Sequence, residues 1–253
     1  RSDIDLIILA VPPKVQIEIL NYNLKFKKKK IFEKPISNNI NLSKNIIRMI
    51  KRKKIKSNIN LTFLNHQLFI KTRNIIKKQK LGKILNFKIL WSFRSFDLDK
   101  KIKSWKTIEN QGGGIKNIFL THVFSYCEFF FGNCKITNYE YKISNFKGID
   151  YKRKISCSIK NQDGSTGKIR LFAKKKGVQE HKITIKFEKG QIQLFTKSKD
   201  WTKNFVLKIH NEISKKRKTI KSKNLSKFKD GRSNQIFIML KNFLKKKHHS
   251  NID

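Results

Sequence analysis

The 253-residue sequence is poor in the residues that small disulfide-rich, metal-binding and membrane proteins depend on. Its three cysteines, Cys127, Cys134 and Cys157, form no Cys-x-x-Cys pair, which argues against both a disulfide framework and a zinc site. No run approaches the roughly 18 apolar residues that a membrane-spanning helix needs, and the chain opens without the pattern of a signal peptide. These absences favour a reducing, cytoplasmic setting with no membrane partner and no metal.

Acidic residues are also few, 17 against 60 basic ones, and the formal net charge of +43 would ordinarily indicate nucleic acid or an anionic membrane as a partner. Only nine of the 60 basic residues are Arg, although Arg makes the better bidentate phosphate contacts. Because AT-rich codons favour Lys, Asn and Ile, an AT-rich genome accounts for this composition without a polyanionic partner. Nucleic-acid binding is therefore the less favoured alternative.

Hydrophobic residues, 38% of the chain, suffice for a core. The first 55 residues alternate short apolar runs with amphipathic helices, as in a doubly wound parallel sheet, whereas residues 135–210 alternate apolar and polar residues between turn signals, as antiparallel strands do. We predict a partial Rossmann sheet over residues 1–55, then an α+β domain with a large, mainly antiparallel sheet over residues 56–253. The predicted strands are 5–11, 31–32, 59–64, 84–93, 135–143, 154–160, 167–173, 181–187, 191–196 and 204–209, and the predicted helices are 15–24, 41–54, 68–79, 115–131 and 234–243. Residues 94–111 are a predicted loop, and residues 214–230 are a basic polar stretch with no predicted element.

The first candidate site is Glu33-Lys34-Pro35, directly after the second predicted strand. Ligands of open α/β sheets bind at the carboxyl ends of the strands. A lysine there can donate a proton to a substrate oxygen, and the preceding Glu33 can orient it. The alternative is a surface Glu–Lys pair at a strand end.

The second candidate site is Gly112-Gly113-Gly114 followed by His122 on an apolar helix. Glycines before a helix leave backbone N–H groups open to a ligand. A partly buried histidine can act as a general acid or base. The alternative is a core histidine that is satisfied by a hydrogen bond.

In this order, the motifs resemble the Gfo/Idh/MocA oxidoreductases, the family of glucose–fructose oxidoreductase and inositol dehydrogenase. The resemblance implies hydride transfer between NAD or NADP and a hydroxyl-bearing carbon of a sugar, cyclitol or related small molecule. It also implies a homo-oligomer, formed through the open sheet face. The matching segments are Asp3 to Pro13 (fourth Rossmann strand), Ile31 to Pro35 (E-K-P), Leu81 to Ile84, Trp105 with Gly112-Gly113-Gly114 and His122, Phe129 to Gly132, and Asp230-Gly231-Arg232.

The family resemblance also assigns roles to individual residues. Lys34 would polarise or protonate the reacting oxygen, and His122 would be the base. Pro12, Pro13 and Glu33 would lie beside the cofactor together with Lys34. The cofactor would carry the redox chemistry, while the protein would supply placement and proton handling.

The chain departs from the family pattern at several of these positions. Ile118 stands where the family often has an Asp, four residues before the histidine, and Tyr126, four residues after His122, is the candidate substitute. Gln16 replaces a family histidine. His66 is either a substrate contact or a solvated loop residue.

The first Rossmann βαβ unit, with the glycine-rich pyrophosphate loop and the acidic ribose ligand, would precede Arg1. We therefore expect a truncated oxidoreductase that by itself binds dinucleotide poorly and is inactive. The open alternative is a non-catalytic family member that binds a sugar-type ligand or a partner.

Overall fold

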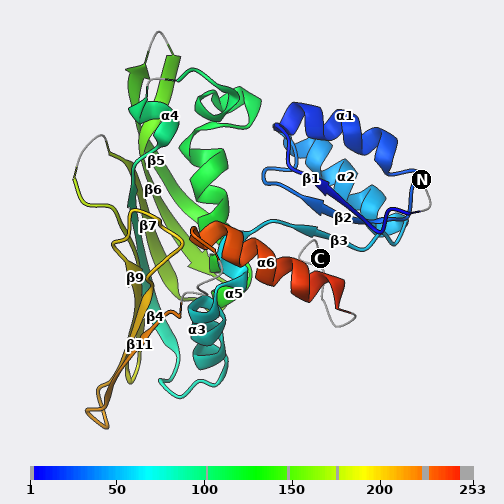
Figure 1. Cartoon of the computed structure of the whole chain (residues 1–253). Helices are drawn as coiled ribbons and strands as arrows, with labels where there is room; N and C mark the ends of the chain where they lie inside the picture. The colour runs from blue at the N-terminus through cyan, green and yellow to red at the C-terminus, as the bar shows by residue number, and fades with distance from the viewer. Residues whose placement is uncertain (1–2, 101, 147–148, 175–176, 224–227, 246–253) are drawn as a thin grey trace.

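The computed structural model describes residues 3–100, 102–146, 149–174, 177–223 and 228–245 (Figure 1). A 3-stranded sheet has the order β1-β2-β3, and an 8-stranded sheet has the order β11-β10-β9-β8-β4-β7-β6-β5. The small sheet is parallel, and the large one is antiparallel apart from the β4–β7 pair. This architecture confirms the predicted fold class, a partial Rossmann sheet followed by an α+β domain.

The small sheet consists of three short strands, of which only β1 is apolar throughout, while β2 and β3 end in apolar residues. α1 begins at Pro13, where a proline costs no helical hydrogen bond, and Asn39 caps α2 by accepting from the N–H groups of Asn41 and Leu42. Both helices pack apolar side chains on the sheet, among them Leu20 and Ile46. The elements are β1 (Leu6–Leu9), α1 (Pro13–Asn23), β2 (Lys29–Phe32), α2 (Ile40–Arg52) and β3 (Ser57–Ile59).

The strand predicted at 59–64 is wrong, since β3 ends at Ile59 and a 3-10 helix η1 (Thr62–Asn65) follows. The apolar residues of this run belong to two different cores. Ile59 packs against the core of the small sheet, whereas Phe63 is buried in the core of the large one. The run marks the crossing between the two sheets.

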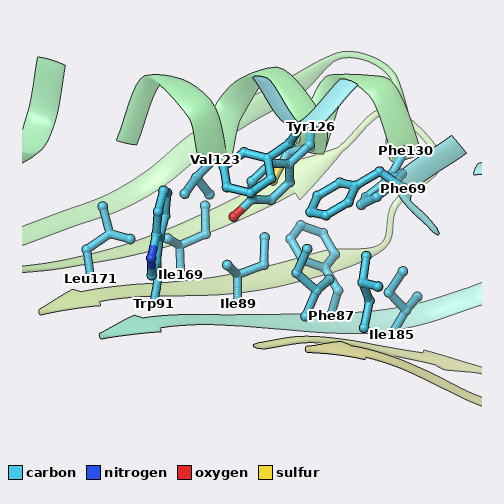
Figure 2. Packing of buried hydrophobic residues seen from close by; sticks show 14 of the residues in the cluster. Phe69, Phe87, Ile89, Trp91, Val123, Tyr126, Phe130, Ile169, Leu171 and Ile185 are labelled. Carbon is cyan, nitrogen blue, oxygen red and sulfur yellow. The ribbon is translucent and has the colours of Figure 1, made fainter. Parts of the chain in front are cut away.

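Helices α3 and α5 cover one face of the large sheet (Figure 1). Figure 2 shows Tyr126 and Phe130 of α5 facing Phe87, Ile89 and Trp91 of β4. This face holds the main hydrophobic core. The elements are α3 (Gln67–Lys77), β4 (Ile84–Phe93), α5 (Thr121–Phe131), β5 (Cys134–Phe146), β6 (Ile149–Asn161), β7 (Thr166–Ala173), β8 (Glu180–Phe187), β9 (Gly190–Thr196), β10 (Val206–Asn211) and β11 (Arg217–Lys221).

Two segments in which no helix or strand was predicted contain regular structure. Residues 94–111 include α4 (Phe96–Asp99), η2 (Trp105–Thr107) and η3 (Glu109–Gln111), and residues 214–230 include β11. β11 pairs only with β10, at the sheet edge, and remains mostly exposed, so it lacks the alternation that identifies a strand. Residues 224–227 of that stretch lie outside the described residues.

The last helix, α6 (Gly231–Leu244), connects the two sheets (Figure 1). Its residues Met239 and Phe243 pack against Ile31 of β2. Asp230 caps it by accepting from the N–H of Ser233. Within the described residues, no helix is long and apolar enough to cross a membrane.

Candidate active site

The carboxyl ends of β1 and β2 lie side by side, because the strands are parallel with Leu9 opposite Phe32. Pro12 and Pro13 follow β1, and Glu33-Lys34-Pro35 follows β2. The predicted cofactor-side residues are thus brought together at one edge of the sheet. With Pro35, which follows Lys34, all three prolines of the chain lie at this edge.

Gln16, on the first turn of α1, fixes the backbone on both sides of Lys34. The side chain is fully buried, and its Nε2 donates to the carbonyls of Glu33, Pro35 and Ile36 at 3.1, 3.3 and 3.0 Å. Its Oε1 accepts from the N–H of Glu33 at 3.2 Å. The sequence marked this position only as a departure from the family histidine, and the structure gives it a positioning role.

The carboxylate of Glu33 turns toward the end of the third strand. Its Oε1 accepts from Nδ2 of Asn60 at 2.5 Å, and the backbone N–H of Asn60 donates to the carbonyl of Phe32. The other amide atom of Asn60, Oδ1, is buried without a hydrogen-bond partner among the described residues. The ends of all three parallel strands therefore meet around Glu33.

Lys34 does not form the surface pair with Glu33 that was the alternative. Its Nζ donates to the carbonyl of Ile118 at 2.6 Å, which links the small sheet to the helix that carries His122. Burial lowers the pKa of Lys34 to about 8; the Glu33 carboxylate opposes this shift and the Lys106 ammonium adds to it. At neutral pH the amine is mainly protonated and close to its titration range.

Gly112 allows a loop of the second domain to approach the strand ends. It has φ of +90°, and a Cβ there would lie 2.8 Å from Cγ of Pro13 and 3.4 Å from Cγ of Pro35. The expectation of open N–H groups is wrong for two of the three glycines, since the N–H of Gly112 donates to Glu109 and that of Gly113 to Ile108. Gly112 and Gly113 instead allow neighbouring segments to come close, because a Cβ at either position would collide with them.

The predicted helix 115–131 is present but is not α-helical throughout, because only Gly114 and Ile115 are α-helical before an irregular turn. Lys116–Leu120 form a π-helical turn, η4, and α5 follows from Thr121. The side chain of Asn117 donates to the carbonyls of Gly113 and Glu109. This turn places the Ile118 carbonyl at Lys34.

His122 is buried at 4% exposure, and its Nδ1 has no hydrogen-bond partner among the described residues. It is thus not a core histidine satisfied through that atom. Phe63 contacts the ring edge-to-face, with the centroids 5.5 Å apart. Burial, then the charges of Lys34 and His181, hold the pKa of His122 well below its usual range, so the ring is neutral at physiological pH.

The hydroxyl of Tyr126 does not replace the missing carboxylate at His122. It lies 3.0 Å from Nε2 of His181, whose ring stacks on Trp91 at 4.4 Å between centroids. Sequence reasoning missed His181, although alternation along β8 places it on the buried face with Ile183. Tyr126 and His181 form a buried pair within the core.

His66 is buried at 3% exposure, so the solvated alternative is wrong. It caps α3, where its Nδ1 accepts from the N–H of Leu68 at 3.2 Å. Burial lowers its pKa to about 4. In the described part of the chain, no cluster of three or more His, Cys, Asp or Glu could hold a metal ion.

Comparison with known proteins identifies the family. Residues 69–193 match the GFO/IDH/MocA C-terminal domain, and this chain belongs to the Gfo/Idh/MocA family, as its motifs predicted. No curated protein matches the chain in sequence.

Among solved structures, levoglucosan dehydrogenase in complex with NADH and levoglucosan aligns over 96% of this chain and 70% of its own, with a TM-score of 0.81 and 16% identity. KijD10, a 3-ketoreductase from Actinomadura kijaniata bound to TDP-benzene and NADP, aligns over 98% and 72%, with a TM-score of 0.72 and 13% identity. A putative NADPH-dependent oxidoreductase from Desulfitobacterium hafniense aligns over 98% and 73%, with a TM-score of 0.75 and 14% identity. At these identities the likeness establishes the shared fold.

Proposed function

We propose that the protein is an NAD(P)-dependent oxidoreductase that transfers a hydride between a nicotinamide cofactor and a hydroxyl-bearing carbon of a sugar, cyclitol or related molecule. The observation that carries this proposal is the Lys34 ammonium at the strand ends, bound to the helix of a buried, neutral His122. The structural neighbours bound to NADH with levoglucosan or L-sorbose, and to NADP, support the cofactor and the substrate class.

The residues at the strand ends fit a nicotinamide cofactor. Pro12, Pro13, Glu33 and Lys34 surround the place where ligands of open α/β sheets bind. Nδ1 of His122, a buried polar atom of this site, lacks a partner among the described residues. When bound, the cofactor would supply the hydride donor or acceptor.

In the proposed reduction, Lys34 would donate its proton to the carbonyl oxygen as the hydride reaches the carbon. In the oxidation, the hydroxyl proton would follow the reverse path to Lys34 as the hydride leaves, and His122, the candidate base, would share the transfer. A neutral imidazole can accept a proton, and an amine whose pKa is about 8 can donate one near neutral pH. His122 would thus work from the neutral state that its burial favours, and Lys34 from an ammonium whose proton burial makes easier to release.

The decisive experiment is transfer of deuterium from C4-deuterated reduced nicotinamide to a sugar product, followed by mass spectrometry. NADH and NADPH are tested with a panel of keto-sugars. Reduced nicotinamide mononucleotide is tested as well, because it presents the nicotinamide without pyrophosphate and adenosine. A deuterated product supports the proposal, and unlabelled sugar with all three donors argues against it.

A second candidate is a non-catalytic member that binds a sugar-type ligand. The observation that favours it is Ile118, which gives His122 no carboxylate partner. Binding of a keto-sugar, measured by calorimetry, without any deuterium transfer would support this second candidate function.

We also propose that residues 1–55, with β3 completing their sheet, hold the cofactor, and that residues 56–253 hold the substrate and mediate self-association. The face of the large sheet opposite α3 and α5 would form the contact (Figure 1). Lys168 and Arg170 are exposed there, so association should strengthen with salt, as light scattering can measure. A cytoplasmic location, consistent with three cysteines outside any disulfide, belongs to the same proposal.

A further inference from the structure

The π-turn at the start of α5 changes how many helical carbonyls find a backbone partner. In an α-helix each N–H bonds to the carbonyl four residues earlier, and in a π-turn to the carbonyl five residues earlier. Where the π-turn Lys116–Leu120 ends and α5 begins, the spacing of the backbone hydrogen bonds changes from five residues to four. One more carbonyl than N–H is then left in this turn, and it needs another donor.

Side chains supply donors at two consecutive positions of this turn. Oγ1 of Thr121 donates to the carbonyl of Asn117 at 2.9 Å, and Nζ of Lys34 donates to the carbonyl of Ile118 at 2.6 Å. The first contact is local. The second joins residues 84 positions apart in the chain, and it is the one that reaches the candidate catalytic lysine.

We propose that the Ile118 main-chain carbonyl, which lies within the π-turn, is the positioning group that holds Lys34 for catalysis, in place of a side-chain carboxylate at this position. The inference deepens the proposed function and rests on it for the catalytic role of Lys34. A carbonyl accepts a hydrogen bond without adding a negative charge. It therefore holds the amine in place while leaving its proton easier to release than a carboxylate would.

Gln16 and Ile118 hold the two ends of Lys34, the backbone and the amine. Gln16 fixes the backbone through the carbonyls and the N–H around it, and Ile118 receives the end of the side chain. The position of the amine is thereby set by neutral groups, while burial, the Glu33 carboxylate and the Lys106 ammonium act on its pKa. Glu33, the nearest carboxylate on the same loop, is engaged by Asn60.

The first test variant removes the π-turn by deletion of the exposed Lys116, which should restore an α-helical register and withdraw the carbonyl. Lys116→Ala, which keeps the length, is its control. The pH dependence of Lys34 acetylation by acetic anhydride, followed by peptide mass spectrometry, measures the titration midpoint of this one amine without cofactor or turnover. We expect a midpoint near 8 in the native chain and in Lys116→Ala, and a rise toward 10.5 in the deletion variant as the unheld amine reaches solvent.

The second test places a carboxylate at the same position. Ile118→Asp should raise the midpoint by about one to two pH units, because an opposite charge favours the ammonium, while Ile118→Asn should leave it near 8. Where deuterium transfer is measurable, the deletion should lower kcat at least tenfold with KM within about threefold, and Ile118→Asp should move the pH profile to higher pH.

These outcomes separate the two proposals. Unchanged acetylation midpoints in the folded deletion variant, or in Ile118→Asp if the deletion does not fold, would overturn the role of the carbonyl. Shifted midpoints in a protein that transfers no deuterium would support the carbonyl contact and contradict the proposed function.

Discussion

Strand β2 carries a buried lysine near its start, and a half-buried lysine follows its end; the two differ in what their amines contact. Nζ of Lys30 donates to the carbonyls of Phe26 and Lys28 at 2.6 and 3.0 Å, both in the turn that leads into the strand. Nζ of Lys34 donates to Ile118, from the other domain. Burial lowers the pKa of both amines.

The comparison separates a structural lysine from a candidate catalytic one. An ammonium has three N–H donors. Within the described residues Lys30 uses two of them locally, whereas Lys34 uses one across the domains and lies where substrates of such sheets bind. In a chain with 51 lysines, partners and position therefore identify the candidate, and abundance does not.

The distinction between the two lysines is tested most directly by removing each amine in turn. Lys34→Met should lower kcat for deuterium transfer by about 100-fold or more, since general acid catalysis contributes 10²–10⁴-fold. Lys30→Met should keep kcat but lower the free energy of unfolding by about 1–3 kcal/mol, because the two carbonyls of the preceding turn lose this donor. Steady-state kinetics and urea unfolding measure the two effects. Equal losses of kcat in both variants would contradict the distinction.

The next effect concerns the backbone that carries Lys34. Gln16→Leu removes one acceptor and the donors to three carbonyls, and should lower the free energy of unfolding by about 3 kcal/mol. The kcat should fall as well, because Lys34 loses its fixed position. Gln162→Leu, at an exposed turn, is the matched control and should alter neither quantity. If Gln16→Leu unfolds at the same denaturant concentration as the native protein and keeps the native kcat, the positioning role of Gln16 is wrong.

The fold was largely predictable, because most elements have local signals. Apolar runs predicted β1 and β2, and alternation predicted β4 and most strands of the large sheet. The errors arose where tertiary context overrides those signals. The run at 59–64 serves two cores, and β11 is an edge strand with no buried face.

From the sequence, the site could be predicted only as a set of residue types that occur in a given order along the chain. Lys34 and the glycines are where the motifs indicated, since strand ends and close approaches leave traces in sequence. The carbonyl of Ile118 left no such trace, because it is a main-chain atom within a helix irregularity. Gln16 and His181 act through contacts with residues distant in sequence, which no local pattern encodes.

A third test concerns a buried group that stays neutral, the imidazole of His66. Folding lowers the pKa of His66 to about 4, whereas the unfolded chain takes up that proton below 6.5. Its contribution to stability is thus complete above pH 6.5 and is lost as pH falls toward 4. His66→Asn keeps a capping side chain and should reduce the dependence of unfolding free energy on pH by about 1.4 kcal/mol per unit between pH 6 and 5. Parallel urea titrations at both pH values measure this, and an unchanged slope would mean that the native His66 is protonated.

The smallest effect should come from a lysine that neither closes a turn nor reaches the site. Lys168 is exposed on the open face of the large sheet, with Ser158 and Lys88 as cross-strand neighbours. Lys168→Thr keeps a residue that suits a strand and removes a like charge beside Lys88, so the free energy of unfolding should change by less than about 0.5 kcal/mol. Deuterium transfer should be unaffected. A loss comparable to that of Lys30→Met would mean that the open-face lysines carry structural contacts too, and that burial and partners do not suffice to distinguish among the lysines of this chain.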